Sequence, residues 1–404
     1  MQPLRVLWLI DHVCYDGDLH GGGRLFMSLP PRFDRDRIQI FPYFLRSAPE
    51  IKRVFEEARR PVVDLARGKY DPTTLLTVDR LCREHGIDVM HLFCYAASTF
   101  GRLVGRLRGV PTVIQDFDTQ VYFPYPPYLK AMDRLLAAGT GRALASSSFC
   151  RDYMRDVRKV PGDRIDIMYH ALSDSLLEPA GHADRAAARA RLRWPQDAFV
   201  FAAITKLGPD RGNETLLRAF KTAVEQAPQL RLALVYKPTL YHRLPAEYAS
   251  IDWARDVNRM RAMINDQVRG LDLERSVDLI EMSGSLEPYY AASDMLVAPF
   301  ENVRFSSVNL VEGLAYGRPF IATDLGEPKE IAKQFEVGVL VPPKDPAQLA
   351  NVMLELAGAP ERVRELGRRA SDAARQFTVK AAAERLSTLY ETLAAARRHA
   401  AATA

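Results

Sequence analysis

Short apolar segments that alternate with helical patterns constrain the fold of this chain more than any other feature. In the first half they cover residues 4–10, 87–93, 112–117, 143–147 and 166–169, and in the second half residues 199–204, 230–236, 277–281, 295–299, 319–323 and 338–341. Most are apolar at consecutive positions, which is typical of parallel strands that helices cover on both faces. The alternation therefore predicts an α/β fold with parallel sheets.

The length of the chain and one break in this alternation predict two domains. A chain of 404 residues exceeds what a single hydrophobic core usually supports. Residues 173–198 interrupt the alternation and contain Pro179, Gly181, Pro195 and a short Ala/Arg stretch, so we interpret them as a linker. We expect two facing, doubly wound, Rossmann-like domains with ligands in the cleft between them, at the carboxyl ends of the strands.

Composition argues against several other classes of protein. The hydrophobic fraction of 48% and the charged fraction of 26% indicate a globular chain rather than a disordered one. A net charge of +5 without a basic stripe interleaved with aromatics gives no reason to expect nucleic-acid binding. No cysteine pair or His/Cys cluster has metal spacing, and no apolar run is long enough to span a membrane. We expect a cytoplasmic protein with free thiols.

The segment FSSVNLVEGLAYGRP, residues 305–319, has features of an anion site. Ser306 or Ser307 can cap a helix after the preceding strand, and the first turn of that helix offers backbone N–H groups and the positive end of the helix dipole. Glu312, about two turns further on, can accept hydrogen bonds from ribose hydroxyls if it faces the cleft. Taken alone, a capped helix with a solvated glutamate explains the segment better.

The loop in TKLGPDRGNETLLRAF, residues 205–220, strengthens the case for a phosphate site. It carries Lys206 and Arg211 between a strand and an amphipathic helix. Two fixed cations five residues apart on a glycine-containing loop suit a pyrophosphate, and they can stabilise charge that grows on a leaving diphosphate. Two solvated basic residues explain the loop equally well when it is considered alone.

Together, these segments resemble the glycosyltransferase group 1 family, the retaining nucleotide-sugar glycosyltransferases with the GT-B architecture. The family loop reads Arg-Leu and then Lys-Gly, and Lys206-Leu207 and Arg211-Gly212 fill these places with the two cations exchanged. The segments SGSLEPYYAASDMLVAP, EGLAYGRPFIATDLGEPKEI and VGVLVPPKDPAQLANVM are similar to the family in the same order. The resemblance covers most of the C-terminal half and, more weakly, the first half.

The resemblance implies a role for each domain and for the two candidate segments. Residues 1–178 would bind the acceptor, with a C-terminal helix at about 380–404 packed back on them, and residues 179–379 would bind the donor. Lys206 and Arg211 would stabilise the departing diphosphate without an obligatory metal or cofactor. The donor-binding residues would be Gly22, Gly23, Arg304, Ser306, Ser307, Val308, Asn309 and Glu312.

Two departures from the family pattern leave the donor sugar open. The family carries two glutamates with seven residues between them; the second matches Glu312, but the first falls at Arg304, which instead suits an acidic sugar or a phosphate. A histidine that many members place near the reacting sugar falls at Phe117. Its neighbours Asp116 and Asp118 can bind an acceptor hydroxyl, or can simply cap the next segment.

Three further segments are ambiguous. His91 in IDVMHLF and His170 in IMYHALS are candidate contacts for the acceptor or the sugar, although a lone histidine at a strand end is more often structural. The glycines of HGGGRLF resemble the family's glycine-rich loop after the first strand, but a plain turn explains them as well. An Arg/Leu pattern over residues 99–110 is compatible with peripheral contact with an anionic membrane, and a solvated helix face explains it better.

The resemblance thus implies a retaining, metal-independent glycosyltransferase. Its donor would be a nucleotide-diphosphate sugar, with a UDP-sugar favoured over a GDP-sugar, and its acceptor a glycan, a lipid-linked sugar or a small molecule. An alternative is a catalytically weak homologue that serves as a nucleotide-sugar-binding or scaffolding subunit, because the usual Glu and His are replaced. An epimerase or phosphorylase of the same fold is a third reading, and no segment matches the pyridoxal lysine of the phosphorylases.

Overall fold

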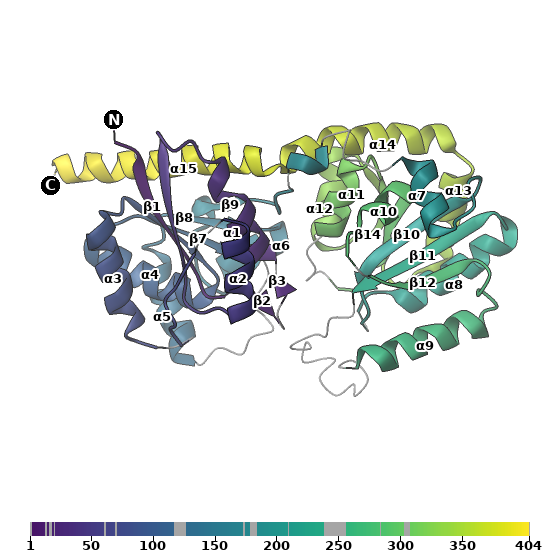
Figure 1. Cartoon of the computed structure of the whole chain (residues 1–404), viewed down its shortest axis with the longest axis horizontal. Coiled ribbons are helices and arrows are strands. Elements are labelled where there is room, and N and C mark those ends of the chain that lie inside the picture. The colour runs from purple at the N-terminus through teal and green to yellow at the C-terminus, as the bar shows by residue number, and fades with distance from the viewer. Residues whose placement is uncertain are drawn as a thin grey trace. The chain divides into compact units, whose positions relative to one another are not determined.

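The structure is a computed structural model of the chain. It describes all residues except 1, 13, 16–17, 20, 60–61, 69–70, 117–126, 173, 178–183, 209, 238–255, 283, 303–307 and 404. The chain forms two compact units (Figure 1). Met1–Ala171 and Thr378–Ala404 make up the N-terminal unit, and Leu172–Phe377 make up the C-terminal unit.

The N-terminal unit is built on a seven-stranded sheet of order β5-β4-β1-β6-β7-β8-β9, in which every neighbouring pair is parallel. The strands are β1 (Leu4–Ile10), β4 (Ile38–Phe44), β5 (Val63–Asp64), β6 (Val89–Phe93), β7 (Thr112–Asp116), β8 (Arg142–Ala145) and β9 (Ile165–Ile167). A short antiparallel pair, β2 (Cys14–Tyr15) and β3 (Asp18–Leu19), follows β1.

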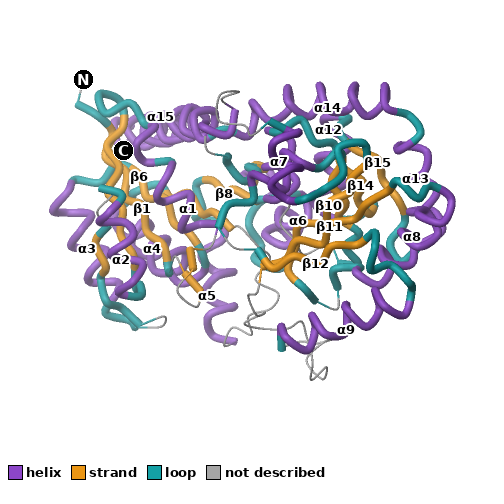
Figure 2. Tube along the Cα trace, turned by 45° about the vertical axis from the view of Figure 1, so that its right-hand side comes forward, coloured by secondary structure: helices purple, strands orange, loops and turns teal. Residues whose placement is uncertain are grey.

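Helices cover both faces of this sheet (Figure 2). They are α1 (Gly21–Ser28), α2 (Pro49–Glu57), α3 (Thr74–His85), α4 (Tyr95–Arg108), α5 (Pro127–Ala137), α6 (Ser148–Asp156) and α15 (Val379–Thr403), with 3-10 turns at Pro30–Arg32 and Gly162–Arg164. Trp8 of β1 packs into one core with α1, α2 and α15, whereas its neighbours Leu7 and Leu9 pack into the other core with α3, α4 and α6. Burial on both faces is why the strand is apolar at consecutive positions.

The C-terminal unit contains a six-stranded parallel sheet of order β12-β11-β10-β13-β14-β15. The strands are β10 (Phe199–Lys206), β11 (Leu230–Lys237), β12 (Val277–Glu281), β13 (Met295–Ala298), β14 (Phe320–Thr323) and β15 (Gly338–Val341). The helices are α7 (Arg185–Leu192), α8 (Asn213–Gln226), α9 (Val257–Gly270), α10 (Glu287–Ala292), α11 (Val308–Ala315), α12 (Gly326–Phe335), α13 (Pro346–Ala357) and α14 (Pro360–Ala374), with 3-10 turns at Asp174–Leu177 and Arg375–Phe377.

The predicted fold class, two α/β domains with parallel sheets, is confirmed. The linker interpretation is wrong over part of residues 173–198, because α7 belongs to the C-terminal unit. Arg189 of α7 is fully buried, and its guanidinium donates to Asp294 Oδ2 at 2.7 Å and to the carbonyl of Ala292 at 2.9 Å. The Ala/Arg stretch of the expected linker therefore contributes a buried ion pair to the C-terminal unit.

Strand β4 was absent from the sequence prediction. Its sequence IQIFPYF contains Pro42, and a proline argues against a central strand. Its outer neighbour β5 pairs only with Tyr43 and Phe44, so most of β4 borders an open edge, where a proline is tolerated.

Helix α15 is part of the N-terminal core. Tyr390 of α15 is fully buried, and its hydroxyl accepts a hydrogen bond from Trp8 Nε1 of β1 at 3.0 Å. On the surface, Arg37 forms an ion pair with Glu391 of the same helix at 3.0 Å. The last helix of the chain is therefore joined to its first strand.

Candidate functional site

The order of strands in the C-terminal sheet reverses between β10 and β13, which lie next to each other. Ligands of doubly wound sheets bind outside the carboxyl ends of the strands at such a switch point. Two loops leave the sheet there, one from β10 to α8 and one from β13 to α11. Both predicted phosphate-binding segments therefore belong to the place where this fold class binds ligands.

The β10–α8 loop is packed on the loop that follows β13. Gly212 has φ = 69°, and a side chain at this position would overlap the carbonyl oxygen of Pro299. The backbone N–H of Glu301 donates to the carbonyl of Asp210 at 3.0 Å. Glycine is therefore required at position 212 both for its left-handed backbone and for this close approach.

Arg211 and Lys206 are held at this corner. The guanidinium carbon of Arg211 lies 5.2 Å from the centroid of the Phe300 ring, and only 9% of the residue is exposed. Stacking on an aromatic ring fixes the plane of a guanidinium, and Arg211 Nε also lies 4.0 Å from Asp210 Oδ1. Lys206 is the last residue of β10 and is half-buried.

The loop that follows β13 is braced by polar contacts from β14, from α8 and from the segment between β15 and α13. Thr323 Oγ1, at the end of β14, donates to the carbonyl of Phe300 at 2.6 Å. The carboxylate of Glu301 accepts from Thr215 Oγ1 of α8 at 3.1 Å and pairs with Lys344 at 3.6 Å. Glu301, out of register with the family's first glutamate, therefore connects the loop to its neighbours.

Helix α11 begins at Val308, which places Val308 and Asn309 in its first turn. The N–H groups of a first turn have no partner within the helix, so they can bind an anion. Asn309 Nδ2 also donates to the carbonyl of Ile204 in β10 at 2.9 Å, which attaches the start of the helix to the strand that carries Lys206. The other predicted donor residues of this segment, Arg304, Ser306 and Ser307, lie outside the described residues.

Glu312 is half-buried on α11, and its carboxylate has a defined partner. The hydroxyl of Tyr290, on α10, donates to Glu312 Oε2 at 2.9 Å. Sequence reasoning missed both Tyr290 and Phe300. Tyr290 lies in a segment similar to the family and Phe300 directly follows that segment, but a pattern of residue types does not tell which carboxylate or guanidinium an aromatic side chain contacts.

Sequence-predicted residues of the N-terminal unit have different surroundings. Gly22 and Gly23 lie in the first turn of α1 rather than in a loop or plain turn, so the expectation of a glycine-rich loop is wrong at these positions. Their role toward a phosphate stays a prediction. His170 is half-buried after β9, and burial lowers its pKa to about 4.

His91 lies in the core of the N-terminal unit. It is fully buried, its Nδ1 lies 2.5 Å from the hydroxyl of Tyr390, and its ring stacks on Phe93 with centroids 4.1 Å apart. Burial lowers the pKa of His91 to about 3, so the ring is neutral at physiological pH. This placement favours the structural interpretation of the histidine.

Asp116 belongs to a buried cluster of charges. Its carboxylate pairs with Arg158, which also pairs with Asp133 at 3.0 Å, and Asp133 pairs in turn with Arg102. All four residues are at most 2% exposed. Burial raises the pKa of Asp116, and the guanidinium of Arg158 opposes that shift. Asp118 and Phe117 lie outside the described residues.

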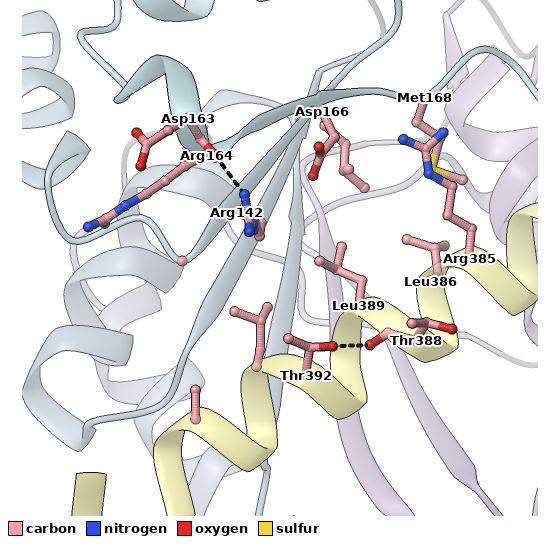
Figure 3. Close-up of a pocket in the computed structure, with 14 residues that line it drawn as sticks. Arg142, Asp163, Arg164, Asp166, Met168, Arg385, Leu386, Thr388, Leu389 and Thr392 are labelled. Atoms are coloured by element: carbon pink, nitrogen blue, oxygen red, sulfur yellow. Dashed lines mark hydrogen bonds between the residues drawn. The ribbon is translucent and has the colours of Figure 1, made fainter. Parts of the chain in front are cut away.

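A groove of about 510 Å³ lies in the N-terminal unit between α15 and the strands β8 and β9 (Figure 3). Leu386 and Leu389 of α15 face Asp166 and Arg142 across it, and Arg142 donates to the carbonyl of Asp163 at 2.7 Å. Arg142 is the first residue of β8, so the groove includes the amino end of that strand. Because ligands of such sheets bind at the carboxyl ends, we assign this groove no part in the chemistry.

The described part of the chain contains no group of three or more His, Cys, Asp or Glu side chains placed to hold a metal ion. Among its helices, none combines the length and the apolar character needed to cross a bilayer.

Comparison with known families agrees with the fold. The profile of the family described as Glycosyl transferases group 1 matches residues 198–359, and that of Glycosyltransferase Family 4 matches residues 25–175. The two parallel-sheet α/β units have the GT-B architecture. The C-terminal unit thus resembles the group 1 glycosyltransferases, and the N-terminal unit resembles Glycosyltransferase Family 4.

Curated relatives share moderate identity with the chain. D-inositol 3-phosphate glycosyltransferase 1 of Catenulispora acidiphila is 26% identical over 399 residues, which are 93% of this chain and 91% of that protein. D-inositol 3-phosphate glycosyltransferase of Thermobispora bispora is 29% identical over 242 residues, which are 57% of this chain and 51% of that protein. The chain thus matches about half the length of the second relative.

Solved structures share the fold at low identity. A glycosyltransferase from Rickettsia africae has a TM-score of 0.77 and 13% identity, with 96% of this chain and 98% of that chain covered. HepE from Anabaena, solved in complex with UDP, has a TM-score of 0.75 and 18% identity, with 96% of this chain and 100% of that chain covered. These likenesses support the GT-B architecture.

Proposed function

We propose that this protein transfers a sugar from a nucleoside-diphosphate donor to a hydroxyl group of an acceptor, with retention of the anomeric configuration and without an obligatory metal. One observation carries the proposal: the corner at the carboxyl ends of β10 and β13. There, Arg211 is stacked on Phe300, and Asn309 attaches the first turn of α11 to β10, which ends at Lys206. Two cations and a helix N-terminus are what a leaving diphosphate requires.

In this proposal, each residue of the corner has one task. Lys206 and Arg211 stabilise negative charge as the bond between the sugar C1 and the diphosphate oxygen breaks. The backbone N–H groups of Val308 and Asn309 hold the phosphates, and Glu312 accepts hydrogen bonds from the donor ribose. The acceptor oxygen bonds to C1 from the same face, and its proton passes to an oxygen of the leaving diphosphate.

For the donor we propose a UDP-sugar first and a GDP-sugar next. HepE, which shares the fold, has been solved with UDP and with UDP-glucose, and this supports the order of testing. For the acceptor we propose a small molecule. Relatives bear the name D-inositol 3-phosphate glycosyltransferase, so D-inositol 3-phosphate is the first acceptor to test, ahead of glycans and lipid-linked sugars.

A thermal-shift screen of UDP, GDP, ADP and dTDP tests the donor site. A ligand that binds only the folded state at a hundred times its dissociation constant should add about 2.7 kcal/mol to the free energy of unfolding. The leading diphosphate then identifies the sugar donors to combine with acceptors, with product detected by mass spectrometry and its anomeric configuration determined by NMR. If none of the four diphosphates raises the melting temperature, the proposed site is refuted.

The screen also separates transfer from the alternative function. If the protein binds UDP and yet neither hydrolyses nor transfers a sugar with any donor and acceptor tested, that result supports the alternative function, a nucleotide-sugar-binding or scaffolding subunit. Measuring donor hydrolysis with and without a candidate partner protein distinguishes a weak enzyme from a scaffold.

A further inference from the structure

The hydrogen bond between Tyr290 and Glu312 joins two helices of the C-terminal unit. Tyr290 lies on α10 and is 2% exposed, while Glu312 lies on α11 and is half-buried. The distance from Tyr290 Oη to Glu312 Oε2 is 2.9 Å. An ionised carboxylate only accepts hydrogen bonds, so the phenol is the donor.

Packing fixes the ring of Tyr290 on one side. It stacks on Tyr316, with ring centroids 5.4 Å and planes 26° apart. A side chain at Gly313 would overlap Leu296 of β13 and would lie 3.7 Å from the Tyr290 ring. The glycine therefore lets α11 approach β13 and α10 closely, one residue after Glu312.

The backbone of α10 is held as well. Ser293 Oγ donates to the carbonyl of Tyr290 at 3.1 Å, and Arg318 donates to the carbonyl of Ala291 at 3.3 Å. Arg318 precedes β14, so this second bond connects α10 to the chain segment after α11. Ring and backbone are both restrained, and the hydroxyl of Tyr290 therefore has a defined position.

Burial, together with the negative charges of Glu287 and Glu312, raises the pKa of Tyr316, the stacking partner of Tyr290, to about 12. The hydroxyl of Tyr316 therefore stays protonated at neutral pH. Each carboxylate oxygen can accept two hydrogen bonds, so the bond from Tyr290 orients the carboxylate without exhausting it.

We propose that Tyr290 is a positioning residue that makes the donor site selective for ribonucleotides. By fixing the plane of the Glu312 carboxylate, its hydroxyl aims the remaining lone pairs at the ribose hydroxyls. This inference rests on the proposed function, in which Glu312 binds the donor ribose. It adds that the discrimination between ribose and 2′-deoxyribose depends on a residue that does not contact the nucleotide.

The test measures dissociation constants for UDP and 2′-deoxy-UDP by isothermal titration calorimetry. The proteins are wild type, Tyr290→Phe, Glu312→Gln and the double variant, with Tyr289→Phe as control, since Tyr289 is the neighbouring tyrosine of α10 and is 8% exposed. A hydrogen bond to a charged group is worth enough that wild type should prefer UDP by roughly tenfold or more. Tyr290→Phe should lose most of that preference, with a larger loss of affinity for UDP than for 2′-deoxy-UDP.

The double variant distinguishes positioning from general structural support. If Tyr290 acts through Glu312, then Tyr290→Phe should change nothing further in the Glu312→Gln background, and Tyr289→Phe should behave as wild type. Equal losses for UDP and 2′-deoxy-UDP, or an undiminished effect in the Glu312→Gln background, would overturn the inference while leaving the donor site intact. Absence of UDP binding in wild type would overturn the proposed donor together with the inference.

Discussion

The two units share one strand–helix alternation but differ in what they do with charge at the carboxyl ends of their strands. In the N-terminal unit, Asp116 at the end of β7 forms a buried ion pair with Arg158. Asp11, just after β1, caps α4 by accepting from the N–H groups of Ala96 and Ala97 at 2.9 and 2.5 Å. Both carboxylates are at most 2% exposed, and both have partners inside the unit.

In the C-terminal unit, the two charged side chains of the candidate site lie against aromatic groups. Arg211 is stacked on the ring of Phe300, and Glu312 accepts a hydrogen bond from the hydroxyl of Tyr290. An aromatic ring or a phenol orients a charged group without neutralising it, whereas an ion pair neutralises it. We therefore propose that the Asp116 cluster serves stability, whereas Arg211 and Glu312 serve donor binding.

The largest expected effect tests the stability half of this comparison. Arg158→Met leaves Asp116 and Asp133 buried without their shared guanidinium, and breaking a buried pair in this way costs about 3–5 kcal/mol. Urea unfolding monitored by circular dichroism measures the loss. Arg155→Met, which removes an exposed arginine three residues earlier, is the matched control and should be nearly neutral. Equal stability of the two variants would show that the buried cluster is not what holds this part of the unit.

The next largest effect tests the proposed binding role of the charges in the C-terminal unit. Arg211→Ala should lower the rate constant of transfer about a hundredfold or more, because the lost cation stabilises charge that is largest in the transition state. Arg211→Lys restores the residue that the family usually has at this place and should keep activity. The test measures initial rates at saturating donor concentration and the melting temperature of each variant. Unchanged turnover in a folded Arg211→Ala would remove the loop from the mechanism.

A smaller effect concerns His91 and pH. The unfolded chain protonates this histidine below about 6.5, whereas the folded chain excludes the proton until about pH 3. Stability should therefore fall as the pH drops through this window, by about 2 kcal/mol at pH 5, because each pH unit of the gap corresponds to about 1.4 kcal/mol. In His91→Gln, the loss of unfolding free energy between pH 7 and pH 5 should be smaller by that amount. An identical pH dependence in wild type and variant would contradict a neutral, buried His91.

The smallest expected effect is that of a chelator. If Lys206 and Arg211 take the place of a metal ion, transfer assayed in EDTA should proceed at essentially the untreated rate. Adding magnesium or manganese afterwards should change little. Loss of activity in EDTA that either ion restores would overturn the metal-independent mechanism and with it the task given to the two cations.

Much of the fold was determined by local sequence. A strand covered by helices on both faces must be apolar at consecutive positions, so β1 and β10 are recognisable without any knowledge of their neighbours. The β10–α8 loop was also recognisable from the sequence, because Arg211 and Gly212 are adjacent. Arg211 supplies a cation, and Gly212 supplies the backbone freedom that the loop requires. Strand β4 was not recognised because it contains a proline. The strand tolerates this proline because β5 pairs with only two of its residues, a fact that the sequence does not show.

What the tertiary structure alone decided is which partner each polar side chain has. His91 and Tyr390 are 299 residues apart in the chain, Asp116 and Arg158 are 42 apart, and Tyr290 and Glu312 are 22 apart. No helical or strand periodicity relates positions at such separations, so the sequence showed the chemical types and left their pairing open. Packing decides whether a carboxylate forms an ion pair with a guanidinium, as Asp116 does, or accepts a hydrogen bond from a phenol, as Glu312 does. We propose that this difference separates a structural charge from one that binds a ligand.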